Sequence, residues 1–263
     1  MRMERINRKK LLTMPIHIVS SRYGLPGLRE LLSAETEESE RAEAFTDAER
    51  ARIARAERLG SLLHAQDRRV SEPYANHLLR VAIRIIRRYQ VSDTDVICAA
   101  LLHDSVEDHP LDLAALATDA ERERGPVEAA LAVLERAFNP RVAELVGAVT
   151  HPAWDPARDK HTQYREHVAA SLEHRPWARI VKISDFTDNG VGLIHTEDEA
   201  MERRLAGKYA PLVPLMRDLA ARPDTPLTDA VKAYIDDQLA TAAERFTAIL
   251  AEDAGNRPAI ATV

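Results

Sequence analysis

The sequence predicts an all-α protein, and three observations lead to this prediction. Only 9 of the 263 residues are glycine, about half of the share that glycine has in average proteins. The chain is rich in Ala, Leu, Glu and Arg, which form helices readily. Apolar residues recur at spacings of three and four, whereas the apolar–polar alternation of strands is nearly absent. We therefore expect a core built from helices.

The first half of the chain predicts three helical segments. Residues 37–63 are highly charged and have no broad apolar stripe before Leu59, which is typical of an exposed N-terminal helix. Residues 73–89 predict a buried helix, because they carry the apolar stripe Leu78, Val81, Ala82, Ile85 and Ile86. Residues 93–108 begin as an apolar run and end in acidic residues, so we expect a third helix there.

The second half predicts helices at several further places. The pair Gly125-Pro126 is typical of a helix start, and an apolar stripe of Leu131, Val133, Leu134 and Phe138 follows it. More helices are expected over residues 141–150, 158–174, 176–188, 197–220 and 228–251. Residues 222–226 predict a short linker before the last helix, whose start Thr228 or Asp229 would cap. We divide the chain into an N-terminal helical extension (1–60), a central domain (61–222) and a C-terminal helix with its tail (223–263).

Composition excludes several classes of protein. The balance of 36 Lys and Arg against 42 Asp and Glu gives a net charge of −6, which argues against nucleic acid as the main partner. Charged residues interrupt every apolar run, so we expect no membrane span. The N-terminus has a basic start without a hydrophobic segment and cleavage site, which indicates a cytoplasmic protein. With Cys98 as its single cysteine, the chain has no disulfide scaffold.

The end of the apolar segment 99–102 indicates chemistry. His103 and Glu107 are four residues apart on a helix, and Asp104 faces both Glu107 and Asp108. These anions gather at the C-terminal end of the helix, where its dipole disfavours them. A divalent metal ion would offset both effects, and His and Asp are common ligands. A solvated acidic helix end is the alternative interpretation.

Two other segments offer further ligands. His77 lies one turn into the stripe-bearing helix, and Asp185 follows the apolar segment 178–184. A lone helical His is usually a core residue, and a lone Asp is usually a cap or a surface charge. Each residue by itself is therefore weak evidence.

Together, the order His, His-Asp, Asp resembles the ligand signature of the HD phosphohydrolase superfamily, and the sequence is similar to the alarmone hydrolase domain of the Rel/Spo family. Five blocks carry the similarity: HAQDRRVSEPY (64–74), AALLHDSVED (99–108), VAELVGAVT (142–150), VKISDFTDN (181–189) and KYAPLVPL (208–215). The resemblance implies an HD-domain helical bundle of about ten helices, with helical extensions at its N- and C-termini, and it places the HD domain at 61–222.

The resemblance also implies roles for single residues. Its metal ligands, with Mn²⁺ the usual ion of the family, would be His77, His103, Asp104 and Asp185. Its catalytic acidic pair would be Glu107 and Asp108. Its nucleotide contacts would be Arg68, Arg69 and Asn189, the two arginines packing on the guanine base. Two nitrogen and two oxygen ligands leave positions open for water and a phosphate oxygen, which suits an octahedral ion.

The implied reaction is hydrolysis of (p)ppGpp at the 3′-oxygen, giving GDP or GTP and pyrophosphate without a covalent intermediate. Only 48 residues follow Leu215, so we expect no synthetase domain of the kind found in bifunctional members. The two extensions have no counterpart that we can assign in the family. We expect them to cover the core or to form an interface in a homo-oligomer.

Departures from the family pattern keep other functions open. The family's Asp-Arg-Leu-His-Asn is Asp185-Phe186-Thr187-Asp188-Asn189 here, and Gly192 replaces a nucleotide-contacting Thr. A lost positive charge and a gained carboxylate favour another phosphate ester, such as the 2′-phosphate of NADPH or a nucleotide of a specialised pathway. A degenerate HD domain that binds nucleotide and regulates a partner is a third hypothesis. An all-α interaction protein with structural His and Asp residues is the fourth.

Overall fold

The computed structural model describes residues 8–37, 45–69, 72–191 and 199–255, and these residues are almost entirely helical. The prediction of an all-α fold is confirmed. Its N-terminal part comprises α1 (Arg8–Thr13), α2 (Ile16–Glu37), α3 (Asp47–Leu63), β1 (Arg68–Arg69), β2 (Glu72–Pro73), α4 (Ala75–Arg87) and α5 (Thr94–Leu102). Its middle part comprises α6 (Ser105–Asp108), α7 (Pro110–Ala114), α8 (Asp119–Arg122), α9 (Pro126–Ala137) and α10 (Pro140–Val149). Its last part comprises α11 (Lys160–Leu172), α12 (Pro176–Val191), α13 (Glu199–Tyr209), a 3-10 helix (Ala210–Leu212), α14 (Val213–Ala221) and α15 (Asp229–Gly255).

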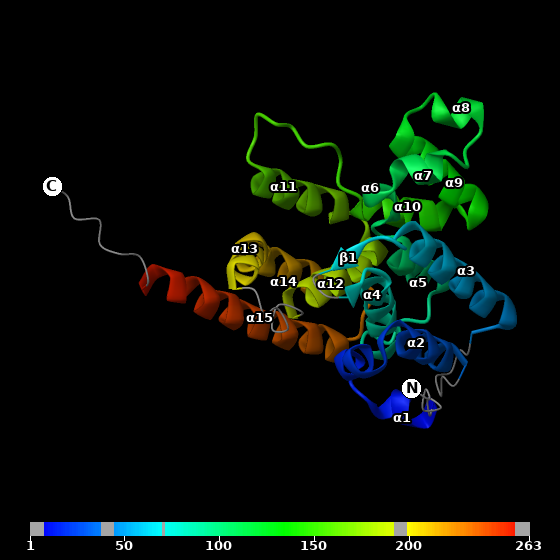
Figure 1. Ribbon diagram of the computed structural model, residues 1–263. Helices are drawn as coiled ribbons and strands as arrows, with labels where there is room; N and C mark the ends of the chain where they lie inside the picture. The colour runs from blue at the N-terminus through cyan, green and yellow to red at the C-terminus, as the bar shows by residue number, and fades with distance from the viewer. Residues whose placement is uncertain (1–7, 38–44, 70–71, 192–198, 256–263) are drawn as a thin grey trace.

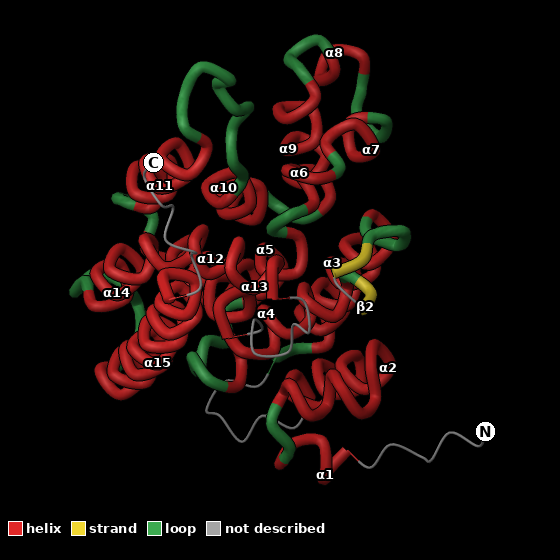
Figure 2. The backbone as a smooth tube through the Cα atoms, turned by 60° about the vertical axis from the view of Figure 1, so that its left-hand side comes forward, coloured by secondary structure: helices red, strands yellow, loops and turns green. Residues whose placement is uncertain are grey.

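The centre of the molecule is formed by α4, α5 and α12, which pack against one another (Figure 2). The predicted stripe of α4 is fully buried, and α5 is buried on nearly all its sides. A helix that is apolar on all its faces lies inside the protein, because burying each face takes apolar surface out of water. These helices therefore provide a rigid frame for any side chains that they hold.

The N-terminal region packs more closely on this centre than its sequence indicates. Helix α2 was not predicted, because Gly24 and Pro26 interrupt its pattern; Gly24 has a φ of 57°, and the helix kinks there. Buried side chains of α2, among them Leu28 and Leu31, pack on α4. Within the predicted helix 37–63, residues 47–63 form α3, and 38–44 lie outside the described residues.

The contact between α3 and α5 depends on Gly60. A Cβ atom at this position would lie 2.4 Å from the backbone oxygen of Leu101. Only glycine allows the two helices to approach this closely. The charged face of α3 stays largely exposed, as its sequence predicts, while Ile53 and Ala56 are buried.

The predicted helix 93–108 is interrupted, which corrects the sequence interpretation. It forms α5 and α6 with His103 and Asp104 in the turn between them. The His103 ring bonds through Nδ1 to the carbonyl oxygen of Ala100, at 2.9 Å. That oxygen is the normal acceptor for the amide of Asp104, so the side chain occupies a group that a continuous helix needs. The break aims both side chains at α4.

The C-terminal helices follow their predicted positions with one further break. The predicted helix 197–220 is divided around Pro211 into α13, the 3-10 helix and α14; residues 197–198 lie outside the described part. Helix α15 follows Thr228, whose Oγ1 accepts from the amide of Val231. Both α2 and α15 contribute to the same hydrophobic core as α4. The division at residues 60 and 222 stays a prediction. Among the described residues, no helix combines the length and apolar character needed to cross a membrane.

Candidate active site

Four side chains from three elements converge at the centre of the bundle. His77 comes from α4, His103 and Asp104 from the turn after α5, and Asp185 from α12. The Nε2 atoms of His77 and His103 are 3.3 Å apart. Asp104 Oδ2 lies 2.9 Å from His103 Nε2 and 3.6 Å from His77 Nε2. Asp185 Oδ1 lies 3.3 Å from His77 Nε2 and 3.6 Å from His103 Nε2.

The two imidazoles are held so that Nε2 of each faces the cluster. His77 Nδ1 contacts Asp188 Oδ2 at 2.8 Å, and His103 Nδ1 contacts the Ala100 carbonyl. Because both of these partners are acceptors, each imidazole in its neutral form carries the proton on Nδ1 and presents a lone pair at Nε2. Two imidazole lone pairs and two carboxylate oxygens then meet in a buried space without a donor among them. A cation suits this donor set.

The charges of the cluster lead to the same conclusion. Burial lowers the pKa of His103, but the carboxylates of Asp104 and Asp185 outweigh it and raise the pKa to about 10. Burial opposes ionisation of Asp104 and Asp185, yet the positive groups around them hold the pKa of each carboxyl well below its usual range. The cluster therefore attracts positive charge, which either a proton or a metal ion can supply.

Hydrogen bonds fix the two carboxylates. The Tyr74 hydroxyl donates to Asp104 Oδ2 at 2.6 Å. Lys182 Nζ donates to Asp185 Oδ2 at 2.9 Å, and Asn189 Nδ2 donates to Asp185 Oδ1 at 2.7 Å. Partners of this kind orient metal ligands in proteins.

Asp188 is a positioning residue that sequence reasoning missed. It is buried and forms ion pairs at 2.9 Å with both Arg80 and Arg84 of α4, while it holds His77. From the sequence alone Asp188 counts as an additional carboxylate, but in the structure the two arginines offset its charge. The signal was present in α4, where Arg80 and Arg84 lie three and seven residues after His77 and so share its face.

Glu107 and Asp108 both belong to α6, directly after the turn that carries His103 and Asp104. Glu107 Oε2 accepts from the backbone amide of His151 at 3.0 Å. Both side chains are open to solvent. The pKa of the Asp108 carboxyl is raised to about 6, because the protein removes part of its hydration and because Asp104 and Glu107 are negatively charged. A carboxyl group with this pKa can exchange a proton near neutral pH.

The structure brings two of the three predicted nucleotide contacts together. Arg69 Nη2 donates to Asn189 Oδ1, and the Arg69 guanidinium lies 5.5 Å from the centre of the Tyr74 ring. Arg69 is thus connected through Asn189 to Asp185. Arg68 is exposed on the same short hairpin, which β1 and β2 form.

A group of lysine and aromatic side chains was not predicted. Lys182 and Lys208 each place Nζ 5.3 Å from the centre of the Tyr164 ring, and Lys160 Nζ lies 4.7 Å from that of Trp154. Since Lys182 also bonds Asp185, this cationic surface adjoins the central cluster. These are three of the six lysines of the chain. Of the three, the sequence indicates only Lys160 as a residue that could contact phosphate, and the scarcity of lysines among many arginines is a signal that could have marked the other two.

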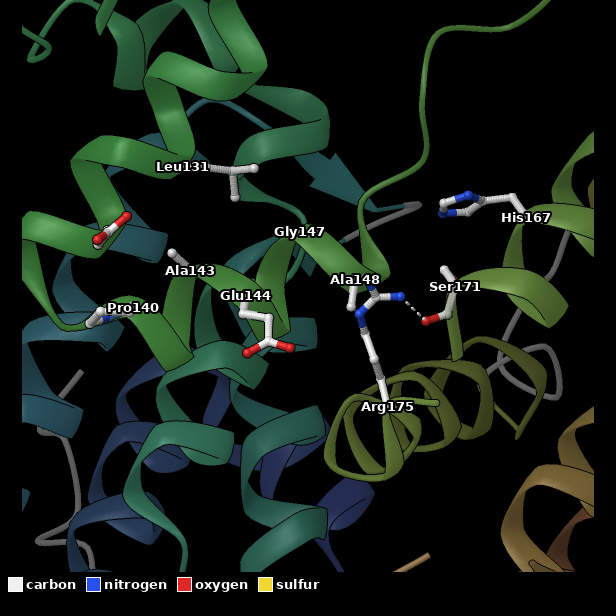
Figure 3. Close-up of a pocket in the computed structure, with 10 residues that line it drawn as sticks. Leu131, Pro140, Ala143, Glu144, Gly147, Ala148, His167, Ser171 and Arg175 are labelled. Atoms are coloured by element: carbon white, nitrogen blue, oxygen red, sulfur yellow. Dashed lines mark hydrogen bonds between the residues drawn. The ribbon is translucent and has the colours of Figure 1, made fainter. Parts of the chain in front are cut away.

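A hollow of about 530 Å³ lies elsewhere, across α9, α10 and α11 (Figure 3). Small or charged side chains such as Ala143, Glu144, Gly147, Ser171 and Arg175 line it. No residue predicted for the site lines it, so its size does not decide where the chemistry takes place.

Comparison with known proteins gives the class of this domain. Residues 53–174 match the family model described as the HD domain. This part of the chain is therefore similar to HD domains, as its motifs predict. The match includes His77, His103 and Asp104, whereas Asp185 lies beyond it.

Curated relatives narrow the resemblance to alarmone hydrolases. The chain is 34% identical over 113 residues to the guanosine-3′,5′-bis(diphosphate) 3′-pyrophosphohydrolase MESH1 of Danio rerio, covering 43% of this chain and 51% of the relative. It is 31% identical over 129 residues to MESH1 of Drosophila melanogaster, covering 48% and 60%. It is 31% identical over 152 residues to a guanosine-3′,5′-bis(diphosphate) 3′-pyrophosphohydrolase of Aquifex aeolicus, covering 56% and 19%. The aligned region spans about half the length of either MESH1. The resemblance to the stand-alone alarmone hydrolases is confirmed.

Proposed function

We propose that this protein is a metal-dependent nucleotide phosphohydrolase that removes the 3′-pyrophosphate of (p)ppGpp. The observation that carries the proposal is the convergence of four acceptor atoms, from His77, His103, Asp104 and Asp185, beside the acidic pair of α6. The names of the relatives supply the substrate class.

These four residues would hold the ion, and we propose Mn²⁺. Two nitrogen and two oxygen ligands suit a borderline divalent ion with further positions for substrate. Such an ion lowers the pKa of water and polarises a phosphoryl oxygen. Within the protein, Tyr74, Asn189 and Lys182 keep the two carboxylates in place.

Asp108 is the proposed proton acceptor. With a pKa of about 6, it is mostly ionised at neutral pH. It takes a proton from the attacking water, while the new bond forms between the water oxygen and the phosphorus next to the 3′-oxygen. The bond from phosphorus to the 3′-oxygen breaks, and this oxygen leaves with the electron pair and takes up a proton. Glu107, held by the His151 amide, shares the positioning of the water.

The remaining site residues fit a polyanionic nucleotide. Arg69 and Asn189 lie together at one side of the cluster, and we assign them with Arg68 to the base and ribose. Lys160 and Lys208 present positive charge over the Trp154 and Tyr164 rings, whereas Lys182 is buried and paired with Asp185. We assign this surface to phosphate oxygens, which lysines bind as point charges.

Two of the departures from the family pattern add no side chain that a nucleotide could contact. Phe186 is 2% exposed and packs its ring edge-on against Tyr209. Asp188 is buried in its ion pairs with α4. Neither side chain is available to a nucleotide. The third departure, at Gly192, lies outside the described residues.

The experiment that tests the proposal is an assay of purified protein with Mn²⁺ and ppGpp. We expect equal release of GDP and pyrophosphate, and we expect Asp104→Ala to abolish it. A parallel reaction with NADPH, followed by phosphate release, examines the alternative phosphate ester. Turnover of NADPH without turnover of ppGpp would refute the alarmone assignment. Binding of ppGpp without any hydrolysis in Mn²⁺ would instead indicate a regulatory HD domain.

Two further expectations belong to this proposal. We place the protein in the cytoplasm, where its nucleotide substrate would be found. We also propose a homo-oligomer, whose interface would use α1 and α2 or α15. Light scattering of the purified protein measures the oligomeric state.

A further inference from the structure

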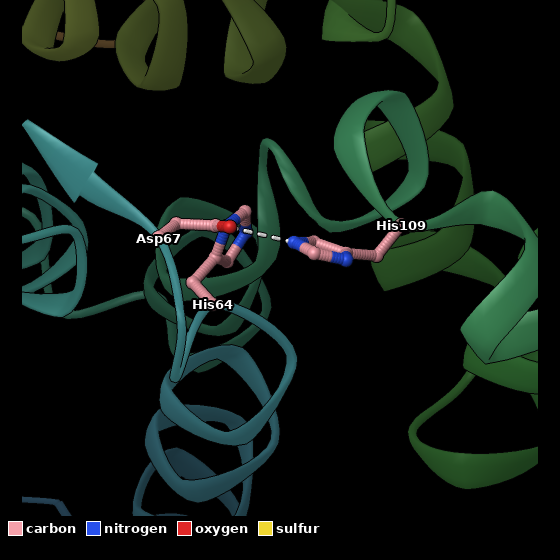
Figure 4. Close-up of side chains that lie close together, drawn as sticks. All are labelled: His64, Asp67 and His109. Atoms are coloured by element: carbon pink, nitrogen blue, oxygen red, sulfur yellow. Dashed lines mark hydrogen bonds and ion pairs between the residues drawn. The ribbon is translucent and has the colours of Figure 1, made fainter.

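We call the cluster of His77, His103, Asp104 and Asp185 the first centre. A second cluster of imidazole and carboxylate groups lies outside it (Figure 4). It is formed by His64 at the end of α3, Asp67 just before β1, and His109 between α6 and α7. One carboxylate oxygen, Asp67 Oδ2, lies 2.7 Å from His64 Nδ1 and 2.7 Å from His109 Nε2. Three groups that commonly bind metals thus present one atom each to the same space.

A fourth residue, Asp112, orients the His109 ring. Metal-ligating side chains in proteins are commonly oriented in this way, by a hydrogen-bond partner that does not itself bind the metal. His109 Nδ1 contacts Asp112 Oδ2 at 3.0 Å. A carboxylate on one ring nitrogen fixes the proton there and leaves the other nitrogen with a lone pair. His77 has the same arrangement, with Asp188 on Nδ1 and Nε2 facing the first centre. Asp112 is not part of the second cluster, so it orients the His109 ring independently of Asp67.

Proton counting shows what an ion would change. Without one, Asp67 Oδ2 accepts from both rings only if both facing nitrogens carry protons. His109 must then be doubly protonated, since its Nδ1 also donates to Asp112. An ion bound to His109 Nε2, Asp67 and His64 Nδ1 replaces that additional proton and leaves the His64 proton on Nε2, so both imidazoles are then neutral.

One member of the cluster, His64, is buried, whereas the other two are partly open to solvent. His64 is 1% exposed and its Nε2 has no hydrogen-bond partner among the described residues, so Nδ1 makes the polar contact of the ring. Burial also lowers the pKa of His64, which favours the neutral form that binds metals. The side chains of His109 and Asp67 are 17% and 35% exposed. Solvent can therefore provide the remaining ligand.

We propose that His64, Asp67 and His109 form a second divalent-metal site, which suits Zn²⁺. Two imidazoles and one carboxylate are a donor set of zinc centres that keep a fourth position for water. The ion would join the end of α3 to the segment that follows Glu107 and Asp108. The His64 ring also stacks on Tyr74 at 4.5 Å, and Tyr74 bonds Asp104, so the new site is in contact with a residue that positions the first centre.

The experiment measures zinc content without nucleotide, so it is independent of the proposed hydrolysis. Metal-free full-length protein is loaded with Zn²⁺, excess ion is removed, and bound zinc is determined by mass spectrometry. We expect the wild type to hold one equivalent more than His109→Ala and one more than Asp67→Asn. His174→Ala is the matched control, because His174 is an exposed histidine outside both clusters, and it should hold as much zinc as the wild type.

A milder variant separates metal binding from folding. Asp112 is largely exposed, so Asp112→Asn should leave the circular dichroism of the metal-free protein unchanged. It should weaken zinc binding at this site about 10–100-fold in calorimetric titration, which is the usual effect of losing a hydrogen-bond partner that orients a metal ligand. Equal zinc content in the wild type, His109→Ala and Asp67→Asn would overturn the proposal, whatever the hydrolysis assay gives.

Discussion

Replacing Asp188 with Asn examines how the protein supports its first centre. This carboxylate contacts three groups of α4: His77 Nδ1 at 2.8 Å, and the guanidinium groups of Arg80 and Arg84 at 2.9 Å. Its side chain is only 4% exposed, and those of the two arginines are 14% and 12% exposed. Asn has the same shape and can still accept from His77, but it removes the negative charge that both arginines need.

The expected cost follows from these contacts. Removing one partner of a buried ion pair typically costs about 3–5 kcal/mol, because a charge remains buried without compensation. Arg80 keeps Glu72 at 2.7 Å, and Arg84 keeps its hydrogen bond to the Ser184 carbonyl oxygen. We therefore expect the lower end, about 3 kcal/mol of unfolding free energy. Because His77 is oriented less firmly, Mn²⁺ binding should weaken about 10–100-fold.

Urea unfolding of the metal-free protein measures the first quantity, and calorimetric titration with Mn²⁺ measures the second. The double variant Arg84→Gln with Asp188→Asn is the control, because it removes one charge of each sign. If the cost is electrostatic, the double variant loses less stability than the sum of the single variants. An Asp188→Asn protein that unfolds and binds Mn²⁺ like the wild type would refute the reasoning.

Three further predictions use the same structure. Hydrolysis should rise with pH as Asp108 loses its proton, and Asp108→Asn should remove this rise from the pH–rate profile. Tyr74→Phe should weaken Mn²⁺ binding measured by calorimetry, since hydrogen bonds to charged groups such as Asp104 are worth about 1.5–3 kcal/mol; unchanged affinity would contradict the assigned role. Gly60→Ala should cost about 1–3 kcal/mol in urea unfolding, because the added Cβ meets the α5 backbone. Gly207→Ala is its control: a Cβ there meets no atom within 4 Å, so stability should not fall.

The helices that could be predicted are those whose own pattern determines their burial. The stripe of α4 and the apolar run of α5 are local signals, and both helices lie where they were expected. Helix α2 was missed because Gly24 and Pro26 break its pattern while packing on α4 maintains the helix. The break at His103 was missed for a related reason: it is accompanied by a side-chain contact to the Ala100 carbonyl, which residue spacing does not show.

The candidate site, too, could be predicted only in part. Its four proposed ligands could be named because short motifs carry them, and the fold brings a carboxylate oxygen of Asp104 and one of Asp185 within 3.6 Å of both imidazole Nε2 atoms. The role of Asp188 could not be predicted, because its partners Arg80 and Arg84 are more than 100 residues away along the chain. The lysine surface was missed because it combines α11, α12 and α13.

Helix α12 shows why the first centre calls for a cation. Its first turn contains the buried Arg179, and its last turn contains the buried Asp188, so both charges oppose the helix dipole. Each is offset by a distant partner: Arg179 by Asp224, and Asp188 by the arginines of α4. Asp185, between them, shares the cluster with a second carboxylate, and Lys182 supplies one positive charge. Two carboxylates against one ammonium group leave a net negative charge among buried lone pairs, and a divalent ion would compensate it.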